Sequence, residues 1–350
     1  MTAAPPVVLT IAGFDPSSGA GVTADIKTIA AHECYGIACI TALTVQSTQG
    51  VRRVEAVDPK VVAGTLVELA SDFEIDAVHI GMLGNEAAAR VVAEFLEQNP
   101  QPHVVLDPIL KSSSGADLVD GAAVRVMIER IFPLAEVIAP NLEEALALTE
   151  GVPRLAPENR GREPSPNRTK GGLDGDPEPS PHRAKGGLDG DPEPSPHGAK
   201  GGLDGDPEPG PPSVSTAQAI ELMREAARHL HALGAANVVV TGGNLEKAVD
   251  LLSFTTGRGV EQEVFKAERQ RSSSTHGTGC AFSTALACHL AQGRGLPEAV
   301  LLAKAYISAA ISNAYAVGRG NGPVHHLYRM TQPRRPTKVV AEAETANANR

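Results

Sequence analysis

The chain has 350 residues with a formal net charge of -10, and 42% of its residues are hydrophobic. This is enough for one large α/β domain or two small ones with a sizeable core. The acidic balance disfavours a nucleic-acid partner, because phosphate backbones require a basic surface. The four cysteines form no CxxC pair, which is typical of reduced thiols in a cytosolic protein.

The N-terminal segment MTAAPPVVLTIAG lacks a basic region followed by a long apolar run, so we expect no signal peptide. The chain has no run of about 18 apolar residues, so we expect no membrane span. The sequence therefore predicts a cytoplasmic protein with no membrane partner.

The first 150 residues alternate short apolar runs with helical patterns. A helix is expected to begin near Ala20, and Asp58 followed by Pro59 is typical of an N-cap and first helical residue. Continuous apolar runs that alternate with helices indicate a mainly parallel sheet covered on both faces. The expected strands are residues 7–12, 37–43, 77–80, 104–106 and 137–139.

The composition changes over residues 153–212, which hold 14 of the 27 prolines. A 15-residue unit begins at Lys170 and Lys185 with KGGLDGDPEPSPH, and a truncated copy begins at Lys200. Each copy carries one Leu and cannot bury enough apolar surface to offset its ordering entropy. We therefore predict one domain over residues 1–330, interrupted by a disordered insertion at 153–212 and followed by a disordered tail at 331–350.

Ordered structure is expected to resume at Ser215, which can form a capping box with Gln218. Further strands are expected at residues 237–241 and 248–252, and helices from near Gly279 and over 297–316. The helix after Ser215 should bury one apolar face, made of Ile220, Met223, Ala227 and Leu230.

The segment Thr275-His276-Gly277-Thr278-Gly279-Cys280 precedes a helical pattern. Two glycines let backbone N–H groups turn inward, and the helix N-terminus adds unpaired N–H groups and a positive dipole end. This arrangement suits a phosphate or the charge on a transferring phosphoryl group. A plain glycine-rich loop that caps a helix is the alternative.

Two weaker motifs follow strands. The loop GFDPSSGAG at residues 13–21 precedes a helix that contains Asp25, but its spacing fits neither a dinucleotide fingerprint nor a Walker loop. Asn141 and Glu144 share one helical face and could hold metal-bound waters around a triphosphate. Each motif has a structural alternative, namely a surface acid for Asp25 and an N-cap for Asn141.

Taken together, these segments resemble the hydroxymethylpyrimidine/phosphomethylpyrimidine kinases of thiamin biosynthesis. The family's first loop and helix are similar to LTIAGFDPSSGAGVTADIKT, and its later motifs are similar, in order, to ITALTVQSTQGV, HIGMLG, VVLDPIL, APNLEEA, THGTGC and NGPVHH. The resemblance covers about residues 7–326 without the insertion. It implies a ribokinase-like α/β fold, with a central, mostly parallel sheet between helices.

The resemblance also implies roles for individual residues. Gly277, Thr278, Gly279 and Cys280 match the family's anion hole and catalytic loop. Asn141 and Glu144 match a motif linked to magnesium and nucleotide phosphates, and Asp107 matches an acid near the same site. The positions that match the pyrimidine pocket are Gly13, Asp25, Gln46 and Met82.

Cys280 occupies the place where sugar kinases of this superfamily carry an aspartate base. Because it lies at a helix N-terminus, we expect the pKa of its thiol to be lowered. A thiolate could then accept the proton of the substrate hydroxyl.

One position departs from the family pattern. Some relatives have Lys before the paired glycines at the end of one strand, whereas Thr241 stands there in this chain. Thr can donate a hydrogen bond to ATP but carries no charge, so either nucleotide affinity is lower or Lys111 or another cation compensates.

The resemblance predicts two successive ATP-dependent phosphorylations, on the hydroxymethyl oxygen and then on the monophosphate, with Mg²⁺ as cofactor and a homodimer as assembly. A pyridoxal or pyridoxine kinase on the same fold is the first alternative. A non-catalytic pyrimidine-binding protein is the second, although the motifs at Asn141–Glu144 and Gly277–Cys280 are intact.

Overall fold

A computed structural model describes residues 4–111, 118–150, 215–243, 245, 248–270, 272 and 274–331. The insertion predicted at 153–212, and all but the first residue of the tail predicted at 331–350, lie outside the described residues.

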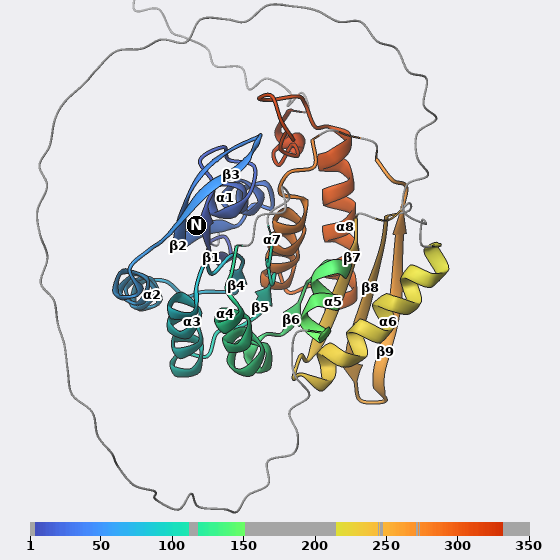
Figure 1. Cartoon of the computed structure of the whole chain (residues 1–350), viewed down its shortest axis with the longest axis horizontal. Helices are drawn as coiled ribbons and strands as arrows, with labels where there is room; N and C mark the ends of the chain where they lie inside the picture. Colours follow the sequence, from blue (N-terminus) through green and yellow to red (C-terminus); the bar gives the residue numbers. More distant parts are fainter. Residues whose placement is uncertain are drawn as a thin grey trace, which may run out of the picture. The chain divides into compact units, whose positions relative to one another are not determined.

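A nine-stranded sheet runs through the described residues in the order β3-β2-β1-β4-β5-β6-β7-β8-β9 (Figure 1). The strands from β2 through β1, β4, β5 and β6 to β7 pair in parallel, while β3, β8 and β9 pair antiparallel at the two edges. The strand bounds are β1 (Val7–Phe14), β2 (Tyr35–Ser47), β3 (Gly50–Ala56), β4 (Ala77–Ile80), β5 (Val104–Leu106), β6 (Val137–Ile138), β7 (Asn237–Gly242), β8 (Ala248–Thr256) and β9 (Gly259–Ala267).

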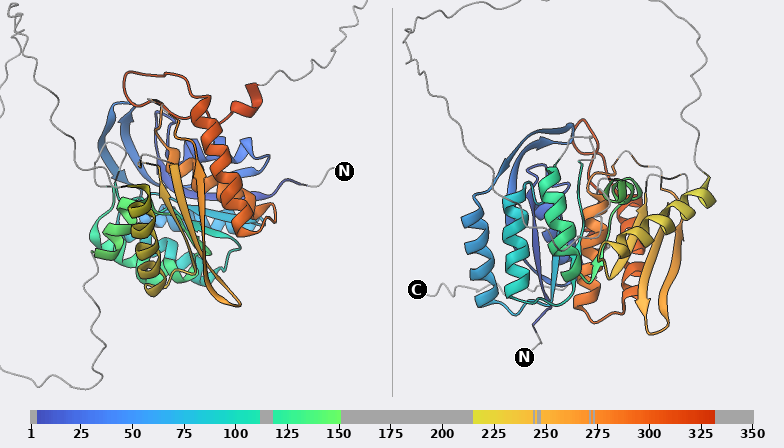
Figure 2. Two further views of the ribbon diagram at one scale, coloured as in Figure 1. Left: turned by 90° about the vertical axis from the view of Figure 1, so that its right-hand side faces the viewer. Right: turned by 60° about the horizontal axis from the view of Figure 1, so that its bottom comes forward.

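Helices cover both faces of this sheet (Figure 2). One face carries α2 (Pro59–Asp72), α3 (Glu86–Gln98), α4 (Gly121–Val126), α5 (Leu142–Glu150) and α6 (Thr216–Ala232). The other face carries α1 (Gly21–Ala31), α7 (Thr278–Ala291) and α8 (Leu296–Ser312). Short π and 3-10 turns occupy Met127–Ile131, Phe132–Leu134 and Tyr328–Thr331.

Alternation along the strands builds two hydrophobic layers. Leu9 and Ile11 of β1 pack under the first set of helices, whereas Val8 packs under α1, α7 and α8. Successive side chains of a strand point to opposite faces, so both layers are filled from the same short apolar runs. The predicted mostly parallel sheet with helices on both faces is confirmed.

Two predicted helix starts are confirmed by their capping contacts. The Asp58 side chain accepts a hydrogen bond from the N–H of Lys60, and Pro59 is the first helical residue of α2. Ser215 and Gln218 form the reciprocal bonds of a capping box at the start of α6. Both caps satisfy N–H groups that a helix leaves without internal partners.

The edges of the sheet differ from the sequence-based prediction. Strands β3 and β9 were not predicted, because charged and exposed residues interrupt their apolar patterns. Each is paired on only one side, and such an edge strand needs less apolar surface than a central one. The helix predicted to reach residue 316 ends at Ser312, where the side chain of Asn313 donates to the carbonyl of Ala309.

Among the helices that the structure describes, none combines the length and the apolar character that a membrane span requires.

Candidate active site

The predicted site residues gather where the parallel strands end. Gly13 lies at the end of β1 and Met82 follows β4, while Asp107, Asn141 and Thr241 lie at or just beyond the ends of β5, β6 and β7. The carboxyl ends of parallel strands lie along one edge of a sheet, where open α/β folds bind ligands. The sheet topology therefore brings together motifs that are far apart in the sequence.

The loop before α1 is tied to the loop before α7 by Asp15. Its Oδ2 atom accepts from the N–H of Ala20 at 2.9 Å and lies 2.9 Å from His276 Nε2. Its Oδ1 atom accepts from the N–H and hydroxyl of Ser17. Burial alone would raise the pKa of Asp15, but the bonds from His276 and Ser17 outweigh burial and lower it. Asp15 is therefore a buried carboxylate that locks the two loops together.

The two loops touch through glycines. Gly277 adopts a φ of 78°, and a Cβ atom there would lie 1.9 Å from the carbonyl oxygen of Gly19. Gly277 is also the N-cap of α7, and no side chain caps that helix. Gly277 and Thr278 are half-buried and Gly279 is exposed, so the helix start is open to a ligand. Its first N–H groups and positive dipole end suit an anion.

Two acids lie beside this helix start. Asp107 is 4% exposed and accepts from Ser283 of α7, and a Cβ atom at Gly279 would lie 3.8 Å from its Oδ2 atom. Glu144 is 9% exposed. Burial raises the pKa of Asp107 to about 6, and burial with the charge of Asp107 raises the pKa of Glu144 to about 8. The acids disfavour each other's ionised form, and a cation between them would relieve this repulsion.

Asn141 and Glu144 form a reciprocal cap at the start of α5. The N–H of Glu144 donates to Asn141 Oδ1 at 2.9 Å, and the N–H of Asn141 donates to Glu144 Oε2 at 3.0 Å. The other oxygen of Glu144 lies 3.4 Å from the N–H of Leu110, in the segment that follows Asp107. Asn141 therefore acts as an N-cap, which was the alternative to a role in metal binding for this motif. The same cap holds Glu144 close to the end of β5.

Gly13 and Met82, two of the four residues expected at the pyrimidine pocket, lie against each other, and Gln46 lies beside the loop before α7. A Cβ atom at Gly13 would lie 3.0 Å from the sulfur of Met82, and Gln46 Nε2 lies 3.1 Å from His276 Nε2. The carbonyl of Met82 accepts from the hydroxyl of Thr41 at 2.6 Å, which fixes the turn after β4. Gln46 and Met82 thus lie beside the loops that Asp15 joins.

Asp25 has a different environment from the other three. It is 0% exposed, and its two carboxylate oxygens accept from the hydroxyls of Thr10 and Thr284 at 2.7 and 2.8 Å. A carboxylate with this burial and these partners does not face a ligand. The geometry favours a supporting role for Asp25 beneath α7 over direct contact with a substrate.

Thr241 lies next to Asn141, because its N–H donates to the carbonyl of Pro140 at 2.9 Å. A cation lies under the same strand end. Lys304 Nζ is 2.7 Å from Asp250 Oδ2, and Asp250 Oδ1 accepts from the N–H of Gly242 at 3.1 Å. This pair is buried, so the positive charge of Lys304 is neutralised by Asp250 close to the position where some relatives carry Lys.

The expected lowering of the Cys280 pKa is wrong. Burial is the largest cause of a pKa raised well above the ordinary thiol value, and the negative charges of Asp107 and Asp25 add to it. A helix N-terminus lowers a thiol pKa only when the dipole outweighs desolvation and nearby anions. The raised pKa favours the protonated thiol at neutral pH, which argues against Cys280 as the base.

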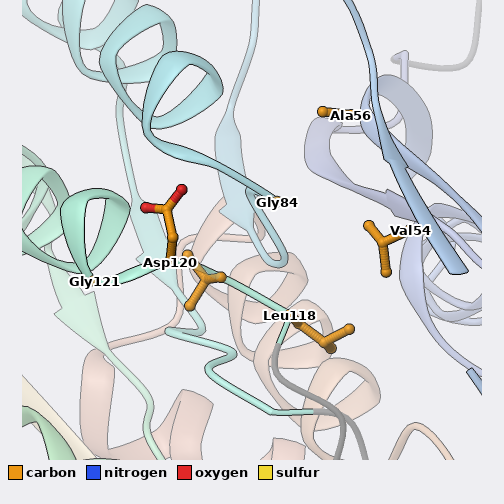
Figure 3. A pocket seen from close by; sticks show the side chains of 7 residues that line it. Val54, Ala56, Gly84, Leu118, Asp120 and Gly121 are labelled. Atoms are coloured by element: carbon orange, nitrogen blue, oxygen red, sulfur yellow. The ribbon is translucent and has the colours of Figure 1, made fainter.

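A cavity of about 560 Å³ opens between β3 and the segment before α4 (Figure 3). Among its described lining residues the only acid is Asp120, which already accepts from the N–H of Ala123 as the cap of α4. These described residues include no cation for a phosphate and no predicted site residue, so we do not place the chemistry there. It is lined by Val54, Ala56, Gly84, Leu118, Val119, Asp120 and Gly121.

Sequence reasoning assigned no role to several residues that build the site. Asp15 and His276 lie in motifs that we quoted, and the run Asp15-Pro16-Ser17-Ser18 has the composition of a turn closed by an Asp side chain. His79 is the first residue of the motif HIGMLG and a titratable residue inside the apolar strand AVHI. The pairing of these side chains across the fold has no sequence signal.

Comparisons with known proteins identify the family of this chain. The family model for phosphomethylpyrimidine kinase matches residues 15–161 and 213–325. The hydroxymethylpyrimidine/phosphomethylpyrimidine kinase of Haemophilus influenzae is 32% identical and aligns over 91% of this chain and 96% of its own. The bifunctional thiamine biosynthesis protein ThiED of Geobacter sulfurreducens is 36% identical over 91% of this chain, which spans only 52% of that protein.

Among solved structures, the pyridoxal kinase of Bacillus subtilis, determined as an ADP complex, superposes with a TM-score of 0.67 at 27% identity. The match covers 93% of this chain and all of that one. The fold and the site thus define a ribokinase-like α/β phosphotransferase. Within that class, the chain belongs to the phosphomethylpyrimidine kinase family.

Replacing Glu144 by Gln tests whether the pKa of the buried Glu144 is raised in the folded protein. Glu144 keeps its proton up to about pH 8 when folded but loses it near its ordinary pKa of 4.5 when unfolded. The folded state binds more protons between these values, so the free energy of unfolding falls as pH rises through them. Glu144→Gln cannot ionise and keeps the acceptor for Asn141.

We expect the melting temperature of Glu144→Gln in EDTA to fall less between about pH 5 and pH 8 than that of the unmodified protein. Glu143→Gln, on the exposed side of the same helix turn, serves as the control and should follow the unmodified protein. Equal slopes for all three proteins would contradict the raised pKa of Glu144.

Replacing Cys280 by Ala tests whether a thiolate takes the substrate proton. Because the thiol is protonated at neutral pH, we expect kcat to stay within about tenfold, whereas loss of a general base costs about 10²–10⁴-fold. Cys39→Ala, at a buried thiol on β2 whose pKa burial raises to about 11, is the matched control. A hundredfold loss confined to Cys280→Ala would restore it as the base.

Proposed function

We propose that the protein transfers the γ-phosphoryl group of ATP to 4-amino-5-hydroxymethyl-2-methylpyrimidine, and then to the resulting monophosphate, in thiamin biosynthesis. The observation that carries the proposal is the start of α7, where an uncapped helix N-terminus with exposed Gly279 lies beside the acids Asp107 and Glu144. Phosphoryl transfer requires donors for the developing charge next to a cation site.

The acids fit magnesium by their chemistry. Hard cations take oxygen ligands, and Mg²⁺ is commonly held by one or two carboxylates together with substrate phosphates. Within the described ranges no group of three or more His, Cys, Asp or Glu residues is arranged to hold a metal, so a site completed by ATP suits this chain. Asp107 and Glu144 would hold the ion, and bound Mg²⁺ would neutralise charge on the phosphates.

The remaining residues position the reactants. Backbone N–H groups at Gly277, Thr278 and Gly279 receive the negative charge of the transferring group. The Gln46 amide is suited to the aminopyrimidine edge, with Met82 against the ring and Gly13 leaving room beside it. These roles are carried over from the family motifs onto residues that the fold brings together.

We infer that the nucleotide binds along the ends of β6 and β7. Asn141 and Thr241 are paired there through their backbones, and the Asn141 amide and the Thr241 hydroxyl can donate hydrogen bonds to phosphate oxygens. Thr241 supplies no charge, and Lys304 is neutralised by Asp250. Nucleotide binding in this chain therefore depends more on the metal and on the N–H groups of α7.

Pyridoxal kinase activity is the second candidate, favoured by the close structural match to the Bacillus subtilis enzyme. The two substrates are both six-membered nitrogen heterocycles with a hydroxymethyl group, so the same anion hole would serve either. A non-catalytic pyrimidine-binding protein is disfavoured, because the helix start and both acids are in place.

A coupled ATPase assay that compares hydroxymethylpyrimidine, its monophosphate and pyridoxal tests the proposal. We expect turnover with both pyrimidines, a kcat/KM for pyridoxal lower by about tenfold or more, and no turnover with EDTA in excess of Mg²⁺. Turnover of pyridoxal alone would overturn the proposal in favour of the second candidate. ATP binding without turnover of any of the three would favour the non-catalytic reading.

We also propose a cytoplasmic homodimer. All four cysteines are free, as is usual where thiols are kept reduced. Strand β2 lies next to the edge strand β3, and near its end it exposes Leu43 and Val45, which are 49% and 48% exposed. Exposed apolar side chains that lie close together are typical of a contact surface.

Sedimentation velocity distinguishes the assemblies. We expect a species of twice the 36.3 kDa chain mass, converted to a monomer by Leu43→Asp. Val260→Asp, at an exposed apolar side chain on the opposite edge of the sheet, should leave the dimer intact. A monomer for the unmodified protein would refute the assembly.

A further inference from the structure

A chain of buried polar side chains crosses the molecule beneath the start of α7. It runs from Asp25 through His79 and Ser283 to Asp107, and these four residues are between 0% and 4% exposed. They come from α1, β4, α7 and the segment after β5. Helix α7 packs against β1, β4 and β5, so side chains from all of these elements meet under its first turns.

His79 is the centre of this polar chain. Thr10 of β1 is its register partner across the parallel pair, so both side chains point toward α7. The Nδ1 atom of His79 lies 3.4 Å from Asp25 Oδ2 and 3.3 Å from the hydroxyl oxygen of Thr10. On the other side, its Nε2 atom lies 2.9 Å from the hydroxyl oxygen of Ser283.

Ser283 connects His79 to the active-site acid and to the helix start. Its hydroxyl oxygen lies 3.0 Å from Asp107 Oδ2 and 3.0 and 3.1 Å from the carbonyl oxygens of Gly279 and Cys280. These three partners are acceptors, and the hydroxyl has one proton to give. The contact with His79 is therefore satisfied when Nε2 is protonated and donates a hydrogen bond to the hydroxyl oxygen of Ser283.

The other ring nitrogen must carry a proton as well. The hydroxyls of Thr10 and Thr284 both direct their protons to Asp25, at 2.7 and 2.8 Å. The contacts recorded for His79 Nδ1 are then with oxygens that offer no proton, including a carboxylate. If Nδ1 were unprotonated, its lone pair would face the lone pairs of these oxygens, which is unfavourable. A protonated Nδ1 can instead donate a hydrogen bond to them. With both nitrogens protonated, His79 is an imidazolium.

The surrounding charges agree with this assignment. Burial alone would lower the pKa of His79, but the charge and hydrogen bond of Asp25, together with the charge of Asp107, outweigh burial and raise it. The buried charges are then one cation between two carboxylates. A buried charge is costly unless it is paired and hydrogen-bonded, and here each of the three is.

We propose that His79 is a positioning residue for phosphoryl transfer: a fixed imidazolium that offsets Asp25 and Asp107 beneath the first turn of α7, so that the helix start can receive negative charge. Both acids lie close enough to that turn to raise the pKa of Cys280. Without a cation below, their charges would weaken the anion site that the transferring group needs. The proposal rests on the function proposed above.

Nitrogen-15 NMR of the unmodified protein with labelled histidine tests the charge directly. We expect both ring nitrogens of His79 to be protonated near neutral pH, with the resonances assigned by their loss in His79→Gln. A neutral ring for His79 in the folded protein overturns the proposal, whatever the variants do.

Variants test the consequence for anion binding. His79→Gln keeps a polar side chain but removes the charge, and we expect it to weaken binding of inorganic phosphate, measured by calorimetry, by about tenfold, as loss of a nearby unit charge predicts. His79→Lys restores the charge and should recover most of that affinity. Binding of hydroxymethylpyrimidine, which is neutral, should change by less than about threefold in both variants.

His32→Gln is the matched control. His32 is also buried under α7 and α8, at 3% exposure, and burial lowers its pKa to about 4, so it is a neutral histidine outside the polar chain. We expect its phosphate affinity to match the unmodified protein. A loss in His79→Gln that His79→Lys does not restore, or an equal loss for phosphate and pyrimidine, would show a structural role only and overturn the proposal.

The outcomes separate this proposal from the function on which it rests. The NMR and phosphate measurements require no turnover. If the unmodified protein phosphorylates neither pyrimidine, the proposed function fails while the imidazolium and its effect on phosphate binding can still hold. If turnover is found with a neutral His79, the function stands and the positioning role fails.

Discussion

The active site depends on the burial of carboxylates beside a helix N-terminus. Asp107 and Glu144 are nearly inaccessible, and burial raises their pKa values because an ionised carboxylate is unfavourable there without a cation. The start of α7 next to them needs an anion. Under the proposed function, a metal-bound triphosphate would satisfy both groups, because the ion would neutralise the acids and the γ-phosphoryl group would accept hydrogen bonds from the helix N–H groups. The buried His79 balances the acids from below.

This electrostatic arrangement requires two loops to approach very closely. Gly277 and Gly19 lie so close together that a Cβ atom at Gly277 would overlap the carbonyl oxygen of Gly19. Asp15 joins the two loops, because its carboxylate accepts a hydrogen bond from the N–H of Ala20 and pairs with His276 of the other loop. The contact fixes where α7 starts relative to β1. Because β1, β4 and β5 lie directly under α7, the same packing determines which polar side chains meet beneath it.

Several parts of the molecule could be read from residue patterns. The apolar runs predicted seven of the described strands. Asp58-Pro59 and the Ser215–Gln218 pair predicted two helix starts. Both kinds of prediction succeed because strand periodicity and helix caps depend on residues that are close in the sequence. The edge strands β3 and β9 were not predicted, because a partly exposed edge strand mixes polar and apolar residues without a clear apolar run. Among site residues, Asp107, Asn141 and Glu144 were found by motif, and the fold places them together.

The sequence by itself determined the α/β class and, through the order of its motifs, the family to which the chain belongs. It could not determine the charge state of any site residue. Cys280 lies at a helix N-terminus, as its motif indicates, yet burial and two acids from other elements reverse the expected direction of its pKa shift. Asp25 reads as a ligand contact but is enclosed by Thr10 and Thr284. Only the tertiary structure decided these cases, because desolvation and charge pairing depend on neighbours from other elements.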